Sequence, residues 1–302
     1  MKRPAVGAVV IGRNEGSRLE TCLRSVLPSV SVVVYVDSAS TDESVALARK
    51  LGAQVVELNP ASPFTAARGR NAGVDRLLQL NSDLQFVQFI DGDCELQPGW
   101  IDTAVEFVNQ NATTAIVCGR RRERYPEQTR YNRLCDIEWD TPVGPTKACG
   151  GDSLVRLSAF KAVGGFDSSL IAGEEPDLCF RLRVKGWNIQ RVDAEMTLHD
   201  ADMRHFLQWW QRNVRSGYAT AEAYHRRGRQ EPELRRNVLS NVLWGVPLGW
   251  PLWPLLWFRV CRRRGSLYAS HIVAGKVPHL IGQMKFWCNR GRGRAGELIE
   301  YK

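Results

Sequence analysis

Strand-like and helix-like segments alternate over the first 110 residues, and this alternation constrains the fold more than any other feature. The clearest strand-like segments are continuous apolar runs: AVGAVVIG, VSVVVYVD, AQVVEL and LQFVQFI. The segments between them, such as SRLETCLRSVL, carry apolar residues at helical spacing. Strands that are apolar on both faces are typical of parallel sheets covered by helices. We therefore expect an α/β fold with a mixed, mostly parallel sheet and helices on both faces.

Two aspartates follow the run LQFVQFI, in the segment FIDGDCELQPGW. In an extended chain Asp91 and Asp93 point to the same side, which suits a hard cation that also holds phosphate oxygens. An Asp-Gly pair is also typical of a hairpin turn. Ligands of parallel sheets bind at the carboxyl ends of the strands, where Asp37 and Asp91 both fall. This placement favours the cation site over the turn.

A second acidic pair, Glu174 and Glu175, opens the segment GEEPDLCFRLRVKGW, in which Pro176 suits the first turn of a helix. Acidic side chains at a helix start interact favourably with the helix dipole, so a capping role is one interpretation. The other interpretation is a general base that faces the same cleft as the aspartates.

The positive charge of the chain belongs to its last third. Residues 203–302 contain 18 Lys and Arg against 5 Asp and Glu, whereas the whole chain has a net charge of +9. A basic region of this kind indicates binding to nucleic acid or to an anionic membrane surface. Because the charges flank an apolar run and do not interleave with stacking aromatics, we expect a membrane surface and no nucleic acid partner.

That apolar run, residues 237–258, contains no charged residue but has three prolines and four tryptophans. Its length would cross a bilayer, but the prolines argue against a simple spanning helix, and tryptophan prefers the membrane interface. We expect membrane association, either through an interfacial or re-entrant segment or through a span. The alternative is a proline-broken hydrophobic cap packed on the main domain.

The eight cysteines form no C-x-x-C pair, which indicates reduced thiols in a cytosolic protein. The start MKRPAVGAVVIG is interpreted as a first strand and not as an export signal, because its apolar run is short and no A-x-A site follows. The expected location is therefore the cytoplasmic face of the inner (plasma) membrane.

Six segments, in this order, resemble the family 2 glycosyltransferases of the GT-A fold. They are VVIGRNEGSRLETCLRSV, VVYVDSASTDES, AARGRNAGV, FIDGDCELQPGW, GGDSLVRLSAFKAVGGFD and GEEPDLCFRLRVKGW. The resemblance implies a GT-A (Rossmann-like) catalytic domain over residues 1–205, with a nucleotide-sugar half over about 1–110 and an acceptor half over about 111–205. Residues 206–302 would then be a basic, Trp-rich, helical and membrane-associated C-terminal region.

The resemblance also implies a nucleotide-sugar donor, usually linked to UDP, and Mn²⁺ or Mg²⁺ as cofactor. Glu15 and Asp37 would face the nucleobase and ribose, and Arg70 would line the nucleotide site. Asp91 would lie near the ribose and the metal, and Asp93 would bind the metal that holds the diphosphate.

Glu175 would be the general base, at a position where the family usually has aspartate, and this departure leaves Glu174 as the alternative. His199 would be a further metal ligand, or else a histidine satisfied by a backbone bond. Asp152 and Trp209 would contact the acceptor, with a turn carboxylate and a core tryptophan as the respective alternatives.

The expected reaction is the inverting transfer of a single sugar to a hydroxyl group of a glycan or lipid-linked acceptor. The segment FLQWWQRNVRSGY lacks the Gln-x-x-Arg-Trp element of processive relatives, which argues against a polymer synthase. A catalytically weak scaffold of the same fold is one alternative. A sugar nucleotidyltransferase is less favoured, because IGRNEGSR carries an acid where a basic, Gly-rich loop would be needed. The Arg-rich stretch 120–133 is expected to be a solvated surface, with an acceptor-side contact as the alternative.

Overall fold

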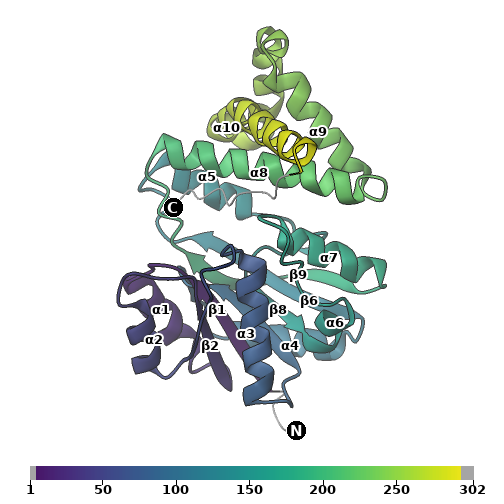
Figure 1. Cartoon of the computed structure of the whole chain (residues 1–302). Coiled ribbons are helices and arrows are strands. Elements are labelled where there is room, and N and C mark those ends of the chain that lie inside the picture. Colours follow the sequence, from purple (N-terminus) through teal and green to yellow (C-terminus); the bar gives the residue numbers. More distant parts are fainter. Residues whose placement is uncertain (1–4, 294–302) are drawn as a thin grey trace. The chain divides into compact units, whose positions relative to one another are not determined.

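The computed structural model describes residues 5–293, which form two compact units (Figure 1). Unit 1 comprises the residues up to Arg124 together with Trp139–Ser169 and Glu174–Ala201. Unit 2 comprises Tyr125–Glu138, Leu170–Gly173 and the residues from Asp202 onward. Unit 2 thus begins slightly before residue 206 and takes two short segments from within the expected catalytic domain.

Within the described residues, unit 1 is built on a nine-stranded sheet of order β3-β2-β1-β4-β8-β6-β9-β5, with β7 paired to β9. Strands β1 (Val6–Gly12), β2 (Val32–Asp37), β3 (Gln54–Glu57) and β4 (Phe86–Asp91) are parallel. The others are β5 (Cys94–Leu96), β6 (Thr114–Glu123), β7 (Gly144–Pro145), β8 (Ser153–Arg156) and β9 (Asn188–His199). Strand β8 is antiparallel to β4 and β6, whereas β6 and β9 are parallel. The sheet is therefore mixed, as expected.

Helices cover both faces of the sheet because alternate side chains of each strand point to opposite sides. Ala8 and Val10 of β1 belong to the core beneath α1 (Ser17–Val26), α2 (Ser44–Leu51) and α4 (Trp100–Gln110). Val9 belongs to the core on the other face, beneath three further helices. These are α3 (Ala66–Leu80), α6 (Leu157–Ala162) and α7 (Glu174–Val184). The predicted α/β architecture is confirmed.

The parallel strands end at one edge of the sheet. In the strand register, Asp37 at the end of β2 lies beside Gly12, and Asp91 at the end of β4 lies beside Ile11. The loops that follow β1, β2 and β4 therefore leave the sheet at the same place. Asp37 and Asp91 therefore lie at the edge of the sheet where ligands bind in such folds, as the sequence predicted.

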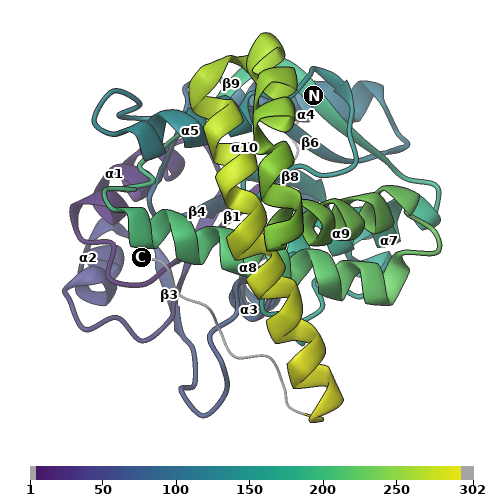
Figure 2. The same ribbon diagram turned by 90° about the horizontal axis from the view of Figure 1, so that it is seen from above.

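Unit 2 is helical over its described residues (Figures 1 and 2). It contains most of α5 (Arg130–Trp139), then α8 (Phe206–Arg227), α9 (Pro232–Gly245), the short 3₁₀ helix η1 (Pro247–Leu252) and α10 (Trp253–Gly291). Two glycines let α8 and α10 pack backbone against backbone. A Cβ on Gly217 would lie 2.1 Å from the His279 carbonyl oxygen, and a Cβ on Gly282 would lie 2.0 Å from the Val214 carbonyl oxygen.

The apolar run 237–258 does not form one continuous helix. It is divided among α9, η1 and α10, with Val246 in an extended conformation between the first two. The prolines of the run lie in η1 and at the start of α10, as expected from their restricted backbone. Among residues 5–293, no helix combines the length and the apolar character that crossing a bilayer requires.

Candidate active site

The segment Asp91–Asp93 is not a hairpin turn. Strand β4 ends at Asp91 and pairs with β1 and β8, whereas β5 begins at Cys94 and pairs with β9. Gly92 connects them at a point of close backbone approach: its N–H donates to the Ile11 carbonyl oxygen at 2.8 Å, and a Cβ there would lie 3.2 Å from that oxygen. The glycine thus lets the chain between the two aspartates pass close to the end of β1.

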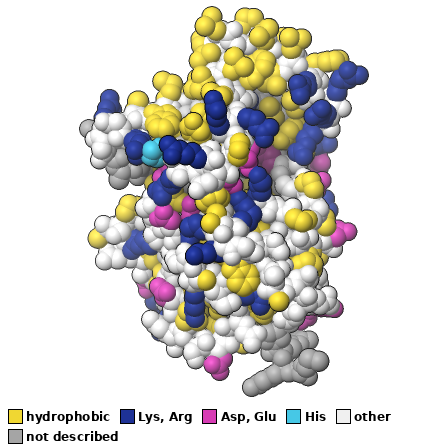
Figure 3. Space-filling model, turned by 90° about the vertical axis from the view of Figure 1, so that its right-hand side faces the viewer, with side chains coloured by type: hydrophobic (Ala, Val, Ile, Leu, Met, Phe, Trp, Pro, Cys, Tyr) yellow, Lys and Arg dark blue, Asp and Glu magenta, His cyan; other side chains and the backbone are white. Residues whose placement is uncertain are grey.

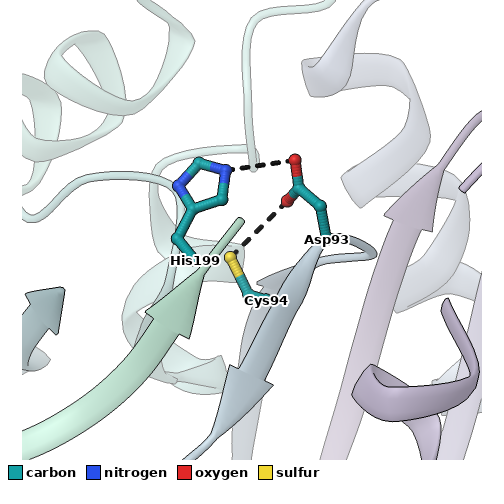
Figure 4. A group of neighbouring side chains, drawn as sticks. All are labelled: Asp93, Cys94 and His199. Carbon is teal, nitrogen blue, oxygen red and sulfur yellow. Dashed lines mark hydrogen bonds and ion pairs between the residues drawn. The ribbon is translucent and has the colours of Figure 1, made fainter. Parts of the chain in front are cut away.

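Asp93 and His199 come together although they are far apart in the sequence, because β5 and β9 pair with Cys94 beside His199. The His199 Nε2 atom lies 3.1 Å from Asp93 Oδ2, and both side chains are buried (Figure 4). The indole of Trp139 stacks on the imidazole, with ring centroids 4.7 Å apart. The sequence predicted both residues as metal ligands, and the structure brings them into one group.

The chemistry of this group fits a divalent cation. Burial, with Arg121 acting in the same direction, lowers the pKa of His199 to about 4, so the imidazole is neutral near pH 7. Both of its ring nitrogens are buried, and apart from the 3.1 Å approach of Nε2 to Asp93 neither has a hydrogen-bond partner in the described part of the chain. A carboxylate and a neutral imidazole are suitable ligands for Mn²⁺.

The third side chain of this group is Cys94, which the sequence reasoning did not consider. Its Sγ lies 3.6 Å from Asp93 Oδ1 (Figure 4). A thiolate is a soft ligand that suits Zn²⁺ better than Mn²⁺ or Mg²⁺, and burial raises the pKa of the Cys94 thiol. Asp93 and His199 are therefore the better ligands.

Asp91 and Glu174 are joined by Arg70. Arg70 lies in the second turn of α3, whose start is fixed by Thr65, since the Thr65 hydroxyl accepts a hydrogen bond from the Arg68 N–H. Its Nη2 donates to Asp91 Oδ1 at 2.8 Å and its Nη1 donates to Glu174 Oε1 at 2.7 Å. The Arg70 side chain is only 4% exposed. The guanidinium thus fixes the carboxylates of Asp91 and Glu174 relative to each other.

Glu174 and Glu175 have different environments at the start of α7. Glu174 is ion-paired with Arg70, whereas Glu175 accepts hydrogen bonds and has no cation partner among residues 5–293. Its Oε1 accepts the Cys149 N–H at 2.6 Å and also contacts the thiols of Cys149 and Cys179 at 3.1 and 2.9 Å. The sequence left open which glutamate acts as base, and these contacts now distinguish them.

Asp152 does not face an acceptor, contrary to the expectation. Its carboxylate is fully buried and lies behind Asp91: Oδ1 accepts the Asp91 N–H at 3.2 Å, and Oδ2 accepts the Thr197 hydroxyl at 2.8 Å. The guanidinium of Arg121 lies 3.0 Å from the same carboxylate. Asp152 is therefore a positioning residue for the end of β4, because a buried carboxylate with these partners has no access to a second substrate.

Arg121 is a functional candidate in a stretch for which the favoured interpretation was a solvated surface. The stretch 120–133 was expected to be a solvated surface, but the Arg121 side chain is 14% exposed, pairs with Asp152 and lies over the Trp139 ring. Its Nη2 is buried and has no hydrogen-bond partner within residues 5–293. The expectation of a solvated surface is therefore wrong at this position. Arg121 offers a positive charge near the carboxylates of the site.

Asp37 and Glu15 lie at the ends of β2 and β1. Both Asp37 oxygens accept hydrogen bonds, from the Tyr35 hydroxyl at 2.9 Å and from the Ser40 N–H at 2.8 Å. Glu15 pairs with Arg18 at 2.9 Å. These contacts fix both carboxylates at the expected edge, while their roles toward a nucleoside stay predictions.

Trp209 is buried within unit 2. It is 4% exposed, and its indole N–H donates to His271 Nδ1 at 2.8 Å. The ring also packs against Phe206, with centroids 5.4 Å apart. The expected stacking on an acceptor sugar is therefore wrong, since the ring has no open face, and the alternative of a core tryptophan holds.

Comparison with known proteins relates this arrangement to an enzyme family. The model described as "Glycosyl transferase family 2" matches residues 8–152, which include Glu15, Asp37, Arg70, Asp91 and Asp93. The succinoglycan biosynthesis protein ExoA of Rhizobium meliloti (strain 1021) is 26% identical over 310 residues, covering 91% of each chain. The pre-mycofactocin glycosyltransferase of Mycobacterium tuberculosis (strain ATCC 25618 / H37Rv) is 30% identical over 145 residues, covering 44% of this chain and 30% of that protein.

Two solved structures share the fold at 16% sequence identity. The mannosyltransferase PcManGT from Pyrobaculum calidifontis, in complex with GDP-Man and Mn²⁺, aligns with a TM-score of 0.66 over 96% of this chain and 89% of that chain. GalNAc-T7 with UDP, GalNAc and Mn²⁺ aligns with a TM-score of 0.51 over 66% of this chain and 44% of that chain. The match of the family 2 model over residues 8–152 and the GT-A fold, with the six motifs in register, show that the chain is a glycosyltransferase with a family 2 domain.

Proposed function

We propose that this enzyme transfers a single sugar from a nucleoside diphosphate sugar to a hydroxyl group, with a divalent cation and with inversion at the anomeric carbon. The observation that carries the proposal is the buried Asp93–His199 pair, at the strand edge that also holds Asp91. The titles of the two structural neighbours support the donor class, since one binds GDP-Man with Mn²⁺ and the other UDP with Mn²⁺. UDP as the nucleotide of this chain stays a prediction from the family resemblance.

The charges of the site explain why a cation is needed. Four carboxylates, of Asp91, Asp93, Asp152 and Glu174, outnumber the cations Arg70 and Arg121 that pair with three of them, and a diphosphate adds more negative charge. Bound by Asp93 and His199, Mn²⁺ or Mg²⁺ would neutralise charge on the departing nucleoside diphosphate. Asp91 stays a predicted additional ligand.

We assign the remaining donor contacts to residues at the same edge. Glu15 follows β1 and Asp37 ends β2 at this edge, which supports a contact of both with the nucleoside half of the donor. Arg70 holds Asp91 in a fixed position through their ion pair at 2.8 Å. Arg121, whose buried Nη2 has no hydrogen-bond partner in the described residues, is suited to a phosphate or sugar oxygen.

Glu175 is the better candidate for the general base. The Glu174 carboxylate is engaged by Arg70 in an ion pair at 2.7 Å, which leaves it less available to an acceptor hydroxyl. The contacts of Glu175 within the described residues all end on Oε1, which leaves Oε2 to take the proton of the acceptor hydroxyl. One displacement then inverts the anomeric carbon, and no covalent nucleophile is required.

Replacement of the two glutamates tests this assignment. Glu175→Gln is expected to lower kcat at least a hundredfold with little change in donor affinity, as for loss of a general base. Glu174→Gln is expected to weaken donor binding, because it releases Arg70 from its position beside Asp91. If Glu174→Gln alone abolishes kcat while Glu175→Gln remains active, the roles are reversed.

Thermal unfolding with nucleotides tests the donor and metal site together. UDP, GDP and their sugars are each added with and without Mn²⁺ to the native protein, Asp93→Ala and the exposed-site control Asp83→Ala. A ligand at about 100 times its Kd stabilises by about 2.7 kcal/mol. We expect a Mn²⁺-dependent rise in Tm with one nucleotide, retained in Asp83→Ala and lost in Asp93→Ala. A shift that Asp93→Ala retains would contradict the metal site.

We also propose that unit 2 binds an anionic membrane surface, on which a lipid-linked acceptor would be presented at the cytoplasmic face of the membrane. The surface consists of exposed apolar side chains of η1 and early α10, followed by exposed arginines. These residues are Leu248, Trp250, Leu252, Leu255 and Phe258, then Arg259, Arg262, Arg263 and Arg264. Figure 3 shows hydrophobic side chains gathered at this end of the unit, with Lys and Arg beside them. Apolar side chains beside arginines complement acyl chains beside anionic headgroups.

Vesicle binding tests this surface. The full chain is sedimented with vesicles of phosphatidylglycerol and phosphatidylcholine, and with phosphatidylcholine alone. We expect binding to the anionic vesicles only, at least tenfold weaker after Leu248→Asp with Leu255→Asp and unchanged after Val143→Asp, an exposed apolar position of unit 1. Equal binding by all three proteins, or none by the native chain, would overturn the proposal.

A further inference from the structure

Two cysteines and a glutamate form a second group of potential ligands in unit 1. Glu175 and Cys179 lie one turn apart on α7, so their side chains share a face of the helix. Cys149 reaches them from the loop between β7 and β8. Its Sγ lies 3.7 Å from Cys179 Sγ and 3.1 Å from Glu175 Oε1, and Cys179 Sγ lies 2.9 Å from the same oxygen. The three ligand atoms therefore form a compact triangle.

We propose that Cys149, Glu175 and Cys179 bind Zn²⁺ as a site separate from the Asp93–His199 pair. With Zn–S bonds of about 2.3 Å, two sulfurs at a tetrahedral ion are about 3.8 Å apart, which agrees with the 3.7 Å between these two. The sulfur–oxygen edges of such a site are about 3.5 Å, so the carboxylate has to withdraw by about half an ångström. Three protein ligands leave a fourth position for water, as in other three-ligand zinc sites.

The charge balance of the group favours the exchange of its two thiol protons for one Zn²⁺. Before binding, the group holds two neutral thiols and a carboxylate that accepts their hydrogen bonds, with a total charge of −1. Binding of Zn²⁺ releases the two thiol protons to solvent and leaves two thiolates, one carboxylate and the ion, again with a charge of −1. The buried site therefore takes up the metal without gaining net charge, which avoids the main cost of burying ions.

The geometry also distinguishes this site from a disulfide. A disulfide needs the sulfurs about 2.05 Å apart, far closer than the 3.7 Å found here. The hydrogen bonds from both thiols to Glu175 favour their protonated form, whereas oxidation and disulfide exchange proceed through a thiolate. A zinc ion replaces the protons directly and keeps the sulfur spacing.

The site shares Glu175 with the proposed reaction. If Glu175 is the general base, as proposed above, Zn²⁺ engages the carboxylate and inhibits transfer. This consequence rests on the proposed function, but metal binding does not. The two are separated by measuring binding spectroscopically and transfer independently.

Cobalt substitution tests the binding. Co²⁺ is titrated into the reduced full-length chain, and thiolate-to-cobalt charge-transfer absorption is recorded, followed by displacement with Zn²⁺. We expect one Co²⁺ with these bands, absent in Cys149→Ser and Cys179→Ser but retained in Cys94→Ser and Cys288→Ser. The Cys94 control reports on the Asp93–His199 group, and Cys288 is an exposed cysteine of unit 2.

X-ray absorption of the native protein loaded with one equivalent of Zn²⁺ provides a measurement that does not depend on the folding of variants. Two sulfur neighbours at about 2.3 Å are expected. Absence of sulfur neighbours, or bands that persist in both Cys149→Ser and Cys179→Ser, would overturn the proposal. So would a thiol titration of the freshly isolated, unfolded chain that finds two thiols missing and restored by reductant, since the pair would then be a disulfide.

Discussion

The guanidinium of Arg70 lies 2.8 Å from the carboxylate of Asp91, and this ion pair links helix α3 on one face of the sheet to the end of β4. Arg70 also forms an ion pair at 2.7 Å with Glu174, at the start of α7. The Arg70 side chain thus connects Asp91, in the nucleotide-sugar half, to the acidic pair at the start of α7. The fork of the guanidinium suits this role, because its nitrogens point to two different carboxylates.

Arg70→Lys is expected to impair both stability and catalysis, because one ammonium group cannot span both carboxylates. Loss of a partner from a buried ion pair costs about 3 kcal/mol or more, and the lysine recovers only part of that. Urea unfolding is expected to show the loss, and steady-state kinetics a higher donor KM. Arg76→Lys, on the same helix but with only weak polar contacts at 3.2 and 3.5 Å, serves as the control and is expected to change the unfolding free energy by about 0.5 kcal/mol at most.

His199→Ala is expected to weaken Mn²⁺ binding at least tenfold while nucleotide binding without metal is retained. The reason is that the imidazole, 3.1 Å from Asp93, supplies the nitrogen ligand of the proposed site. Activity measured over a range of Mn²⁺ concentrations checks this, and excess Mn²⁺ is expected to restore part of it. A variant with unchanged Mn²⁺ dependence but lower Tm would indicate that His199 serves packing alone.

The sequence predicted the sheet, both covering layers of helices and the edge where Asp37 and Asp91 lie, because these follow from local periodicity. It also predicted Asp93 and His199 as one group, through the family resemblance. It misread Arg121 because β6 and β9 pair with register shifts around residues 118–121, which interrupt the alternation that marks buried strand positions. No local pattern could reveal the burial of Asp152 behind Asp91, since it depends on how the loop before β8 folds back onto the sheet.

Trp209 shows a different limit of sequence reasoning. A tryptophan at helical spacing is equally consistent with a sugar-stacking platform and with a core residue. The decision depends on His271, 62 positions further along the chain, which accepts the indole hydrogen bond. The group formed by Cys149, Glu175 and Cys179 was missed for a similar reason, because only the tertiary fold brings the loop cysteine to α7.

Gly282→Ala is expected to destabilise unit 2. The added methyl would lie 2.0 Å from the Val214 carbonyl oxygen and 2.6 Å from the Tyr218 nitrogen, so α8 and α10 would have to move apart. Overpacking of this kind costs about 1–3 kcal/mol. The control is Gly291→Ala at the end of α10, where a Cβ would meet no described atom within 4 Å and a helix former is favourable. Equal melting temperatures for Gly282→Ala and Gly291→Ala would contradict this packing.

Acid is expected to weaken unit 2 through Glu138, whose carboxylate lies 2.6 Å from Arg212 and 2.8 Å from His271. Burial alone would raise the pKa of Glu138, but Arg212 and His271 outweigh it and lower the pKa from 4.5 to about 2. Because the folded-state pKa is depressed, the stabilisation is complete above pH 4.5 and is lost as the pH falls toward 2. The shift corresponds to about 3 kcal/mol at most.

Unfolding free energies measured between pH 7 and pH 2.5 check this contribution. Glu138→Gln is expected to be less stable than the native chain at pH 7 and to approach it as the pH falls, because the native chain then loses the same ion pairs. Glu127→Gln, which removes an exposed carboxylate of unit 2 that lies 3.8 Å from Arg133, is expected to follow the native chain at every pH. A gap between Glu138→Gln and the native chain that stays constant with pH would show that the loss comes from packing and not from the charge of Glu138.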